Sequence, residues 1–192
     1  MKVSGFTFIR NAIIYDYPVV ESIKSILPLC DEFIVAVGNS EDQTRLLIES
    51  ISDSKIKIID TIWDDTLRKN GEVLALETNK VLAAVSEDST WCFYIQGDEV
   101  LEDGMIEYLK SAMTNYQDNM QVDGFLFKYR HFFGSYDYLG VSNSWYKNEI
   151  RIIRNRIGVS SYKDAQGFRK TANKKLTVVS LDAHIHHYGW VK

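Results

Sequence analysis

The sequence has few cysteines. Of its 192 residues only Cys30 and Cys92 are of this type, and neither has a partner at the spacing of metal ligands. We therefore expect two reduced thiols in apolar surroundings, with no disulfide and no zinc site. A chain of this length with 45% hydrophobic residues can bury a sizeable core without disulfides, so a single domain is expected.

Long hydrophobic runs and basic blocks are absent as well. The longest apolar runs have the length of a strand, far below the roughly 20 residues of a membrane span, and the first residues lack the pattern of a signal peptide. A cytoplasmic protein is therefore expected. The net charge is only −4 and no basic block alternates with aromatic residues, so nucleic acid is not an expected partner.

Two nucleotide-binding motifs are missing. The first expected strand is followed by Arg10, Asn11 and Ala12 in place of a Gly-x-Gly-x-x-Gly sequence, and no Walker sequence occurs in the chain. Hydride transfer with a dinucleotide and P-loop phosphate chemistry are therefore not supported.

The most informative stretch that is present lies at 89–99. An apolar, aromatic-rich run of strand length ends there in two adjacent acids, Asp98 and Glu99. Open α/β sheets bind ligands at the carboxyl edge of their strands. Carboxylates at that edge suit Mn²⁺ or Mg²⁺ bridging a diphosphate. The alternative is that the two acids only end the strand and solvate its turn.

Strand and helix patterns alternate through the first half. Apolar runs predict strands at 3–9, 33–37 and 55–60, and apolar residues at helical spacing predict helices at 17–29, 41–51 and 71–85. Ser40 is the expected N-cap of the second helix. This order implies an α/β fold with a largely parallel sheet.

The second half changes character. A short helix is expected at 105–113, followed by strands at 124–133, 149–154 and 176–181, with a histidine cluster after the last strand. No internal repeat or linker divides the chain. The simplest architecture is one domain, 1–192, with a nucleotide-binding half at 1–100 and a smaller, irregular acceptor half at 101–192.

This succession of elements and motifs resembles the family 2 glycosyltransferases over nearly the whole length. Residues 8–11 look like the end of the family's first strand, and residues 97–99 look like the end of its Asp-x-Asp-Glu motif. Ser40, Asp42 and Thr44 match its Ser-x-Asp-x-Thr signature. The resemblance implies the type A glycosyltransferase fold, a single-domain, Rossmann-like, mostly parallel sheet flanked by helices.

The resemblance also implies site residues and a cofactor, Mn²⁺ or Mg²⁺. The implied nucleotide-binding residues are Phe8, Arg10, Asn11, Gly38, Arg68, Gln96 and Gly97. Asp98 is the implied metal ligand, and His187 is the expected second ligand because a late histidine completes the metal site in related folds. For Arg10, a structural salt bridge is the alternative to phosphate contact.

Two positions depart from the family pattern. Gln96 stands where the motif has its first aspartate, and Val37 stands where many members carry an aspartate that contacts the uracil or ribose. These departures leave the nucleotide open. A Gln-x-Asp-Glu motif combined with His-Tyr-Gly-Trp, here at 187–190, is similar to a subgroup of bacterial relatives.

The implied reaction moves a sugar from a nucleotide-diphospho-sugar to an acceptor hydroxyl, with inversion, in the synthesis of cell-surface polysaccharides or glycoconjugates. The expected partners are the nucleotide-sugar donor and a carbohydrate or lipid-linked acceptor. Such chemistry requires charge neutralisation on the leaving diphosphate and a base for the acceptor proton. Asp164 is the expected base, since it lies in a loop with aromatic and polar residues; its alternative role is to cap a turn. The other candidate acids in this half are Asp123, Asp137, Glu149 and Asp182.

Two other classes of function stay open at this point. A nucleotidyltransferase would use a similar sheet and metal, although the expected Gly-rich basic loop is missing after the first strand. A non-catalytic nucleotide- or sugar-binding module is favoured by Gln96. Relatives continue past the position of Trp190, which leaves open a truncated C-terminus and, with it, peripheral association with a membrane.

Overall fold

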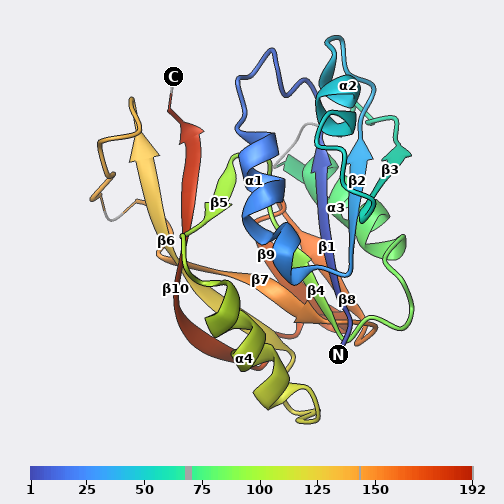
Figure 1. The fold of residues 1–192 in the computed structure, drawn as a ribbon, viewed down its shortest axis with the longest axis vertical. Helices are drawn as coiled ribbons and strands as arrows, with labels where there is room; N and C mark the ends of the chain where they lie inside the picture. Colours follow the sequence, from blue (N-terminus) through green and yellow to red (C-terminus); the bar gives the residue numbers. More distant parts are fainter. Residues whose placement is uncertain (68–70, 143, 192) are drawn as a thin grey trace.

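The structure is a computed structural model that describes residues 1–67, 71–142 and 144–191. Within them, one mixed sheet of eight strands runs through both halves of the chain, in the order β3-β2-β1-β4-β7-β6-β10-β5 (Figure 1). Its strands are β1 (Val3–Ile9), β2 (Glu32–Val37), β3 (Ile56–Asp60), β4 (Trp91–Tyr94), β5 (Glu99–Leu101), β6 (Gly124–Phe133), β7 (Asn148–Arg154) and β10 (Val178–Trp190).

The remaining elements pack around this sheet. The helices are α1 (Val19–Ile26), α2 (Thr44–Glu49), α3 (Glu72–Ala83) and α4 (Ile106–Tyr116), with short 3-10 turns η1 (Leu27–Leu29) and η3 (Thr171–Asn173). A separate hairpin is formed by β8 (Val159–Tyr162) and β9 (Gly167–Lys170). None of the helices described is long and apolar enough to cross a membrane.

The strand directions confirm the expected α/β class. β1 pairs in parallel with β2 and β4, and β2 with β3. β10 pairs in parallel with β6, whereas β7 runs antiparallel to both β4 and β6, and β5 runs antiparallel to β10. The carboxyl ends of β1, β2, β6 and β10 therefore point to one edge of the sheet, at the top of Figure 1. Ligand sites are expected at that edge.

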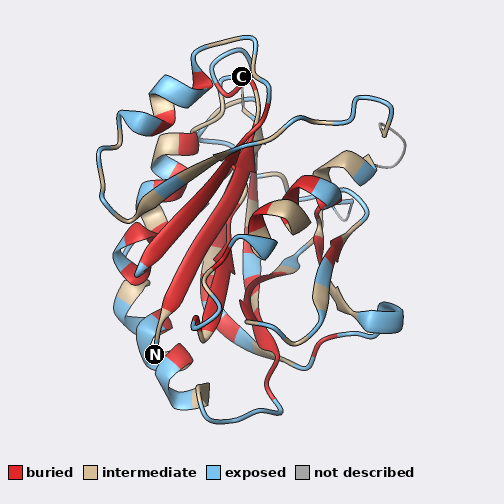
Figure 2. Cartoon of the chain, turned by 90° about the vertical axis from the view of Figure 1, so that its right-hand side faces the viewer, coloured by how far each residue is buried: buried red, intermediate tan, exposed pale blue. Residues whose placement is uncertain are grey.

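Two hydrophobic layers cover the two faces of the sheet. All seven residues of β1 are buried, and their side chains alternate between the layers. Ile9 joins the layer that contains α1 and α4, and Phe6 joins the layer that contains α3. Figure 2 shows the central strands buried along their length, with helices outside them. Burial on both faces explains why these strands are continuous apolar runs in the sequence.

Some boundaries differ from those expected. α2 begins at Thr44, and Ser40 is not its N-cap, because Ser40 Oγ accepts a hydrogen bond from the backbone of the loop after β1. Leu46, one of the apolar residues in the helix expected at 41–51, is 58% exposed. β10 continues through the histidine cluster to Trp190, since it is paired on both sides, with β6 and with β5.

Candidate active site

A cavity of about 450 Å³ opens at the carboxyl ends of β1 and β4. Six of the residues expected at the site contribute to its lining: Phe8, Arg10, Asn11, Gln96, Gly97 and Asp98. The sheet brings them together because β1 and β4 are parallel neighbours, so the segments that follow them emerge at the same edge.

The Ser-x-Asp-x-Thr signature shapes one wall of this cavity. Ser40 Oγ and Thr44 Oγ1 accept hydrogen bonds from the backbone N–H groups of residues 11 and 12, at 3.0 and 2.7 Å. Asp42 Oδ2 accepts from the N–H groups of residues 13 and 14, at 3.0 and 2.9 Å. These side chains hold the loop after β1 in place by saturating its backbone donors. The signature therefore has a structural role in this chain.

Arg10 also contributes to the cavity wall. Its Nη1 is 2.8 Å from Asp65 Oδ1, and its guanidinium lies 5.7 Å from the ring centre of Trp63. Gly38 packs beneath both side chains: a Cβ at this position would overlap the Trp63 indole and lie 3.1 Å from Arg10 Cβ. Gly38 thus supports the cavity wall through its lack of a side chain. Arg68 lies outside the described residues.

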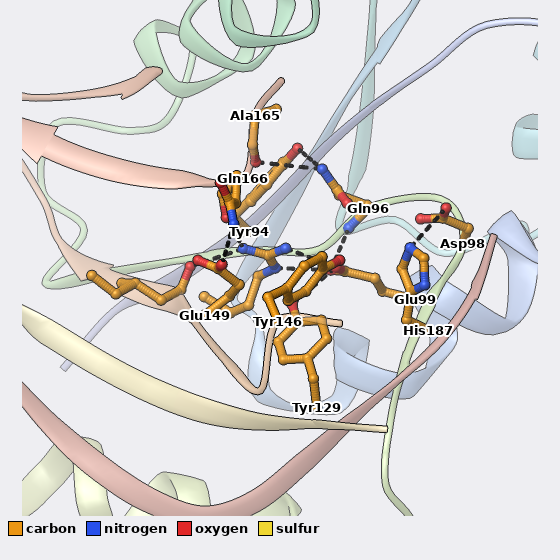
Figure 3. A network of polar contacts seen from close by, with 12 residues as sticks. Tyr94, Gln96, Asp98, Glu99, Tyr129, Tyr146, Glu149, Ala165, Gln166 and His187 are labelled. Carbon is orange, nitrogen blue, oxygen red and sulfur yellow. Dashed lines mark hydrogen bonds and ion pairs between the residues drawn. The ribbon is translucent and has the colours of Figure 1, made fainter. Parts of the chain in front are cut away.

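Asp98 and His187 come together from distant parts of the sequence. His187 Nε2 lies 3.4 Å from Asp98 Oδ2, as Figure 3 shows. Burial alone would lower the pKa of His187, but the hydrogen bond to Asp98 and its charge outweigh this effect and raise that pKa. The two residues predicted to hold a metal are therefore adjacent in the fold.

Gly189 leaves space beside this pair. A Cβ at Gly189 would lie 2.5 Å from Asp98 Oδ2 and 3.2 Å from His187 Nε2. A carboxylate oxygen and an imidazole nitrogen that face one another form a donor set that Mn²⁺ accepts. Across the part of the chain that the structure describes, no group of three or more His, Cys, Asp or Glu side chains could hold a metal ion. A metal bound here would consequently need further oxygen ligands from a nucleotide or water.

Glu99, next to Asp98, has no role in the cavity lining. It is fully buried and accepts two hydrogen bonds from Arg151, at 2.7 and 2.9 Å. The Tyr129 hydroxyl and the backbone N–H of Gln96 also donate to it, at 2.9 and 3.1 Å. Burial would raise the pKa of Glu99, but Arg151 outweighs it and lowers that pKa. The prediction of two ligand-facing carboxylates is therefore wrong for Glu99, whose oxygens are all used within the protein.

Gln96 connects the cavity to the loop that contains Asp164. Its Nε2 donates to the Tyr94 hydroxyl at 3.2 Å and to the Ala165 carbonyl at 3.4 Å (Figure 3). Asp164 itself is exposed and does not contribute to the cavity lining. It lies against Gly71, the residue before α3, where a Cβ would be 2.6 Å from Asp164 Cβ. The structure thus places Asp164 beside the start of α3, outside the lining of the cavity.

His131 was not expected at the site, whereas Glu149 is one of the alternative acids named in the sequence analysis. His131 Nδ1 lies 3.2 Å from His187 Nδ1, and His131 Nε2 lies 2.7 Å from the Tyr146 carbonyl oxygen. Glu149 is a half-buried acid that accepts a hydrogen bond from Gln166, and burial raises its pKa. Nothing in the sequence links His131 to His187, because only the pairing of β6 with β10 makes them neighbours.

Solved structures with a similar fold include S. aureus TarS. The structure of its residues 1–349 in complex with UDP is 17% identical, has a TM-score of 0.61, and is matched over 98% of this chain and 60% of that chain. A longer TarS structure is 14% identical with a TM-score of 0.55, over 98% of this chain and 37% of that one. This chain therefore spans about 60% of the length of the TarS 1–349 structure.

A third structure is more distant. Glucosyl-3-phosphoglycerate synthase from Mycobacterium tuberculosis, in complex with Mn²⁺, UDP-glucose and phosphoglyceric acid, is 18% identical over 68% of this chain and 44% of that chain, with a TM-score of 0.44. No protein-family model and no curated protein matches the sequence. The similarity to TarS establishes the fold, which is that of the type A glycosyltransferases.

Proposed function

We propose that the protein transfers a sugar from a nucleotide-diphospho-sugar to an acceptor hydroxyl. The observation that carries this proposal is the cavity at the carboxyl ends of β1 and β4, with Asp98 in its lining and His187 against Asp98. The similarity of the fold to TarS in complex with UDP supports a uridine nucleotide as the first donor to test. A nucleotide here would lie between the loop held by the Ser-x-Asp-x-Thr signature and the Gly97 backbone.

Asp98 and His187 would hold Mn²⁺ or Mg²⁺, which supplies Lewis-acid stabilisation of the departing diphosphate when bound. Arg10, at the cavity wall, adds positive charge for the phosphates, and Arg68 has the same proposed role. Phe8 provides an apolar surface at the cavity lining. The residues of the protein thus bind and orient the donor, while most of the reactivity comes from the nucleotide leaving group.

We further propose that transfer inverts the anomeric carbon by a single displacement, with Asp164 as the base. In support of this proposal, Asp164 lies against Gly71 at the start of α3, and the next residue, Ala165, accepts a hydrogen bond from Gln96 in the cavity lining. Glu149 is the alternative base, because burial raises its pKa and so makes its carboxylate a stronger base. The proposed acceptor is a carbohydrate or lipid-linked hydroxyl in cell-surface polysaccharide or glycoconjugate synthesis, with peripheral membrane association.

The proposal is tested by measuring nucleotide binding with and without metal. Wild-type protein is titrated with UDP, GDP and ADP by calorimetry, in Mn²⁺ and in EDTA. We expect at least one nucleoside diphosphate to bind about tenfold or more tightly with Mn²⁺, and Asp98→Ala to abolish the difference without unfolding the chain. Asp103→Ala, which removes an exposed acid outside the cavity, is the matched control. Metal-dependent binding by Asp98→Ala that equals the wild type would reject the assignment.

A non-catalytic nucleotide- or sugar-binding module is the second candidate, because Gln96 replaces an acid and its amide is engaged by Tyr94 and Ala165. Metal-dependent consumption of a UDP-sugar would exclude it. Release of UDP would exclude a nucleotidyltransferase, since that reaction would transfer the nucleotidyl group instead.

A further inference from the structure

His187 is the end of a chain of hydrogen bonds that begins at a backbone carbonyl. His131 on β6 and His187 on β10 are register partners in the sheet, and both side chains are buried. The Tyr146 carbonyl oxygen lies 2.7 Å from His131 Nε2, and the two Nδ1 atoms of the histidines lie 3.2 Å apart. His187 Nε2 then faces Asp98 Oδ2 at 3.4 Å.

The donors in this chain follow from its first member. A carbonyl oxygen only accepts, so the contact with Tyr146 requires a proton on His131 Nε2. A neutral imidazole carries one N–H, so in neutral His131 this proton lies on Nε2 and Nδ1 is an acceptor. The short Nδ1 to Nδ1 contact therefore requires His187 to donate from Nδ1. Neutral His187 is left with a lone pair on Nε2, directed at Asp98.

Aromatic packing holds the first ring of the chain in this orientation. The Trp145 ring stacks on His131 with centroids 4.9 Å apart and an interplanar angle of 22°. The Tyr146 ring meets it edge-on, at 4.4 Å and 89°. Turning the His131 ring over would exchange its two nitrogens and break the contact between Nε2 and the Tyr146 carbonyl. The packing and this contact together favour the ring orientation seen in the structure.

We propose that His131, with its proton placed by the Tyr146 carbonyl, is a positioning residue that fixes His187 as the Nδ1–H tautomer and so presents Nε2 to a cation beside Asp98. This inference rests on the proposed metal site. A lone pair and a carboxylate that face one another attract a cation between them, either a proton or a metal ion. Without His131, the hydrogen bond to Asp98 would favour a proton on His187 Nε2, which blocks the nitrogen as a ligand.

The tautomers can be read directly from the protein without nucleotide or metal. The chain has only four histidines, so long-range ¹H–¹⁵N correlation spectra of ¹⁵N-histidine-labelled protein are readily assigned with single substitutions. At a pH above the pKa of His187 we expect the Nε2–H pattern for His131 and the Nδ1–H pattern for His187. An Nε2–H pattern for His187 in the wild type would overturn the proposal.

Variants then test the consequence for metal binding. We expect His131→Phe to shift His187 toward the Nε2–H tautomer and to weaken Mn²⁺ binding in the presence of UDP by about 10-fold to 100-fold. His131→Gln should restore part of the loss, because its amide accepts through Oε1 and donates through Nε2. His184→Phe is the control, since His184 pairs with Glu102 outside the site. UDP binding in EDTA should be equal in all four proteins.

The outcomes separate this inference from the proposed function. Wild-type Mn²⁺ affinity in a folded His131→Phe protein would reject the role of His131 while leaving the metal site intact. The expected tautomers in a wild-type protein that binds no Mn²⁺ would reject the metal site, and with it the role of His131 toward a metal. If His131→Phe does not fold, the wild-type spectrum and the Mn²⁺ affinity of His131→Gln still test the role of His131.

Discussion

Asp98 and Glu99 are adjacent residues with opposite environments. Asp98 lines the cavity and meets His187, whereas Glu99 turns into the core and meets Arg151. A carboxylate in the core is tolerated only when its charge and its lone pairs are matched, and four donors match them here. Consecutive residues thus have different surroundings: Asp98 faces the cavity, and Glu99 is paired with Arg151 in the core.

Removing one partner of this buried pair should be costly. Arg151→Met would leave the charge of Glu99 uncompensated, and we expect a loss of about 3–5 kcal/mol in the free energy of unfolding. Urea denaturation measures the loss. The double variant Arg151→Met with Glu99→Leu should recover much of it, because no unpaired charge remains. A single-variant loss below about 1 kcal/mol would mean that the pair contributes little.

Replacing one carboxylate oxygen of Asp164 by an amide nitrogen tests its proposed role as the base. Asp164→Asn should lower the rate of sugar transfer by about 10²-fold or more, because an amide cannot accept the acceptor proton, while nucleotide affinity is unchanged. Glu149→Gln is the matched comparison, and product stereochemistry by NMR tests inversion. If Asp164→Asn retains near-normal turnover and Glu149→Gln does not, the role passes to Glu149. Retained anomeric configuration would reject the single displacement for either residue.

At the scale of elements, strands buried on both faces could be predicted well. The apolar runs at 3–9 and 124–133 coincide with β1 and β6. The helix expected at 71–85 corresponds to α3, which is slightly shorter than expected. The sequence does not predict β5, because a strand of three residues is too short to show an alternating pattern. Its residues form a strand only through their pairing with β10. The hairpin β8–β9 was missed for a similar reason, since its strands have only four residues each.

Only those residues of the candidate site that belong to sequence motifs could be predicted. Phe8 lies near the end of a strand that the sequence indicates, Arg10 and Asp98 follow such strands, and the resemblance supplied His187. His131 could not be found, because its relation to His187 exists only in the register of β6 and β10. The buried role of Glu99 likewise depends on Arg151, which β7 brings across the sheet.

Glu32 on β2 links neighbouring elements through its carboxylate. It accepts hydrogen bonds from Ser4 on β1 at 2.6 Å and from the N–H of Ser86 after α3 at 2.9 Å, and it pairs with Lys57 on β3 at 2.7 Å. Burial would raise the pKa of Glu32, but these donors outweigh it and lower the pKa to about 2. The folded state thus favours the ionised form.

This lowered pKa predicts how stability depends on pH. The contribution of Glu32 should be complete above its ordinary pKa of 4.5 and should be lost as pH falls toward about 2. The difference in unfolding free energy between wild type and Glu32→Gln is therefore expected to be largest near pH 6 and to shrink below pH 4.5. Glu87→Gln, at a side chain that is 82% exposed, is the control. A difference that stays constant with pH would contradict the linkage.

At the scale of the whole molecule, the sheet separates two cores that each contain one thiol. Cys30 lies in the layer with α1, and Cys92 lies in the layer with α3. Both side chains are buried, and burial raises the pKa of each thiol to about 12. Because both layers share the strands between them, we expect neither to open without the other.

Thiol labelling tests whether the two layers unfold cooperatively. In native buffer, both cysteines should react with a thiol reagent only through global unfolding, and therefore at the same slow rate, because the reactive thiolate forms only in the open chain. Once one thiol is modified, its bulk prevents refolding and the second should follow at once. Mass spectrometry should then find unmodified and doubly modified protein with little singly modified protein between them. Urea near the unfolding midpoint is the control that gives the intrinsic reactivity of each thiol. Accumulation of protein modified only at Cys30 would show that the α1 layer opens by itself, and that the two cores are separate units of stability.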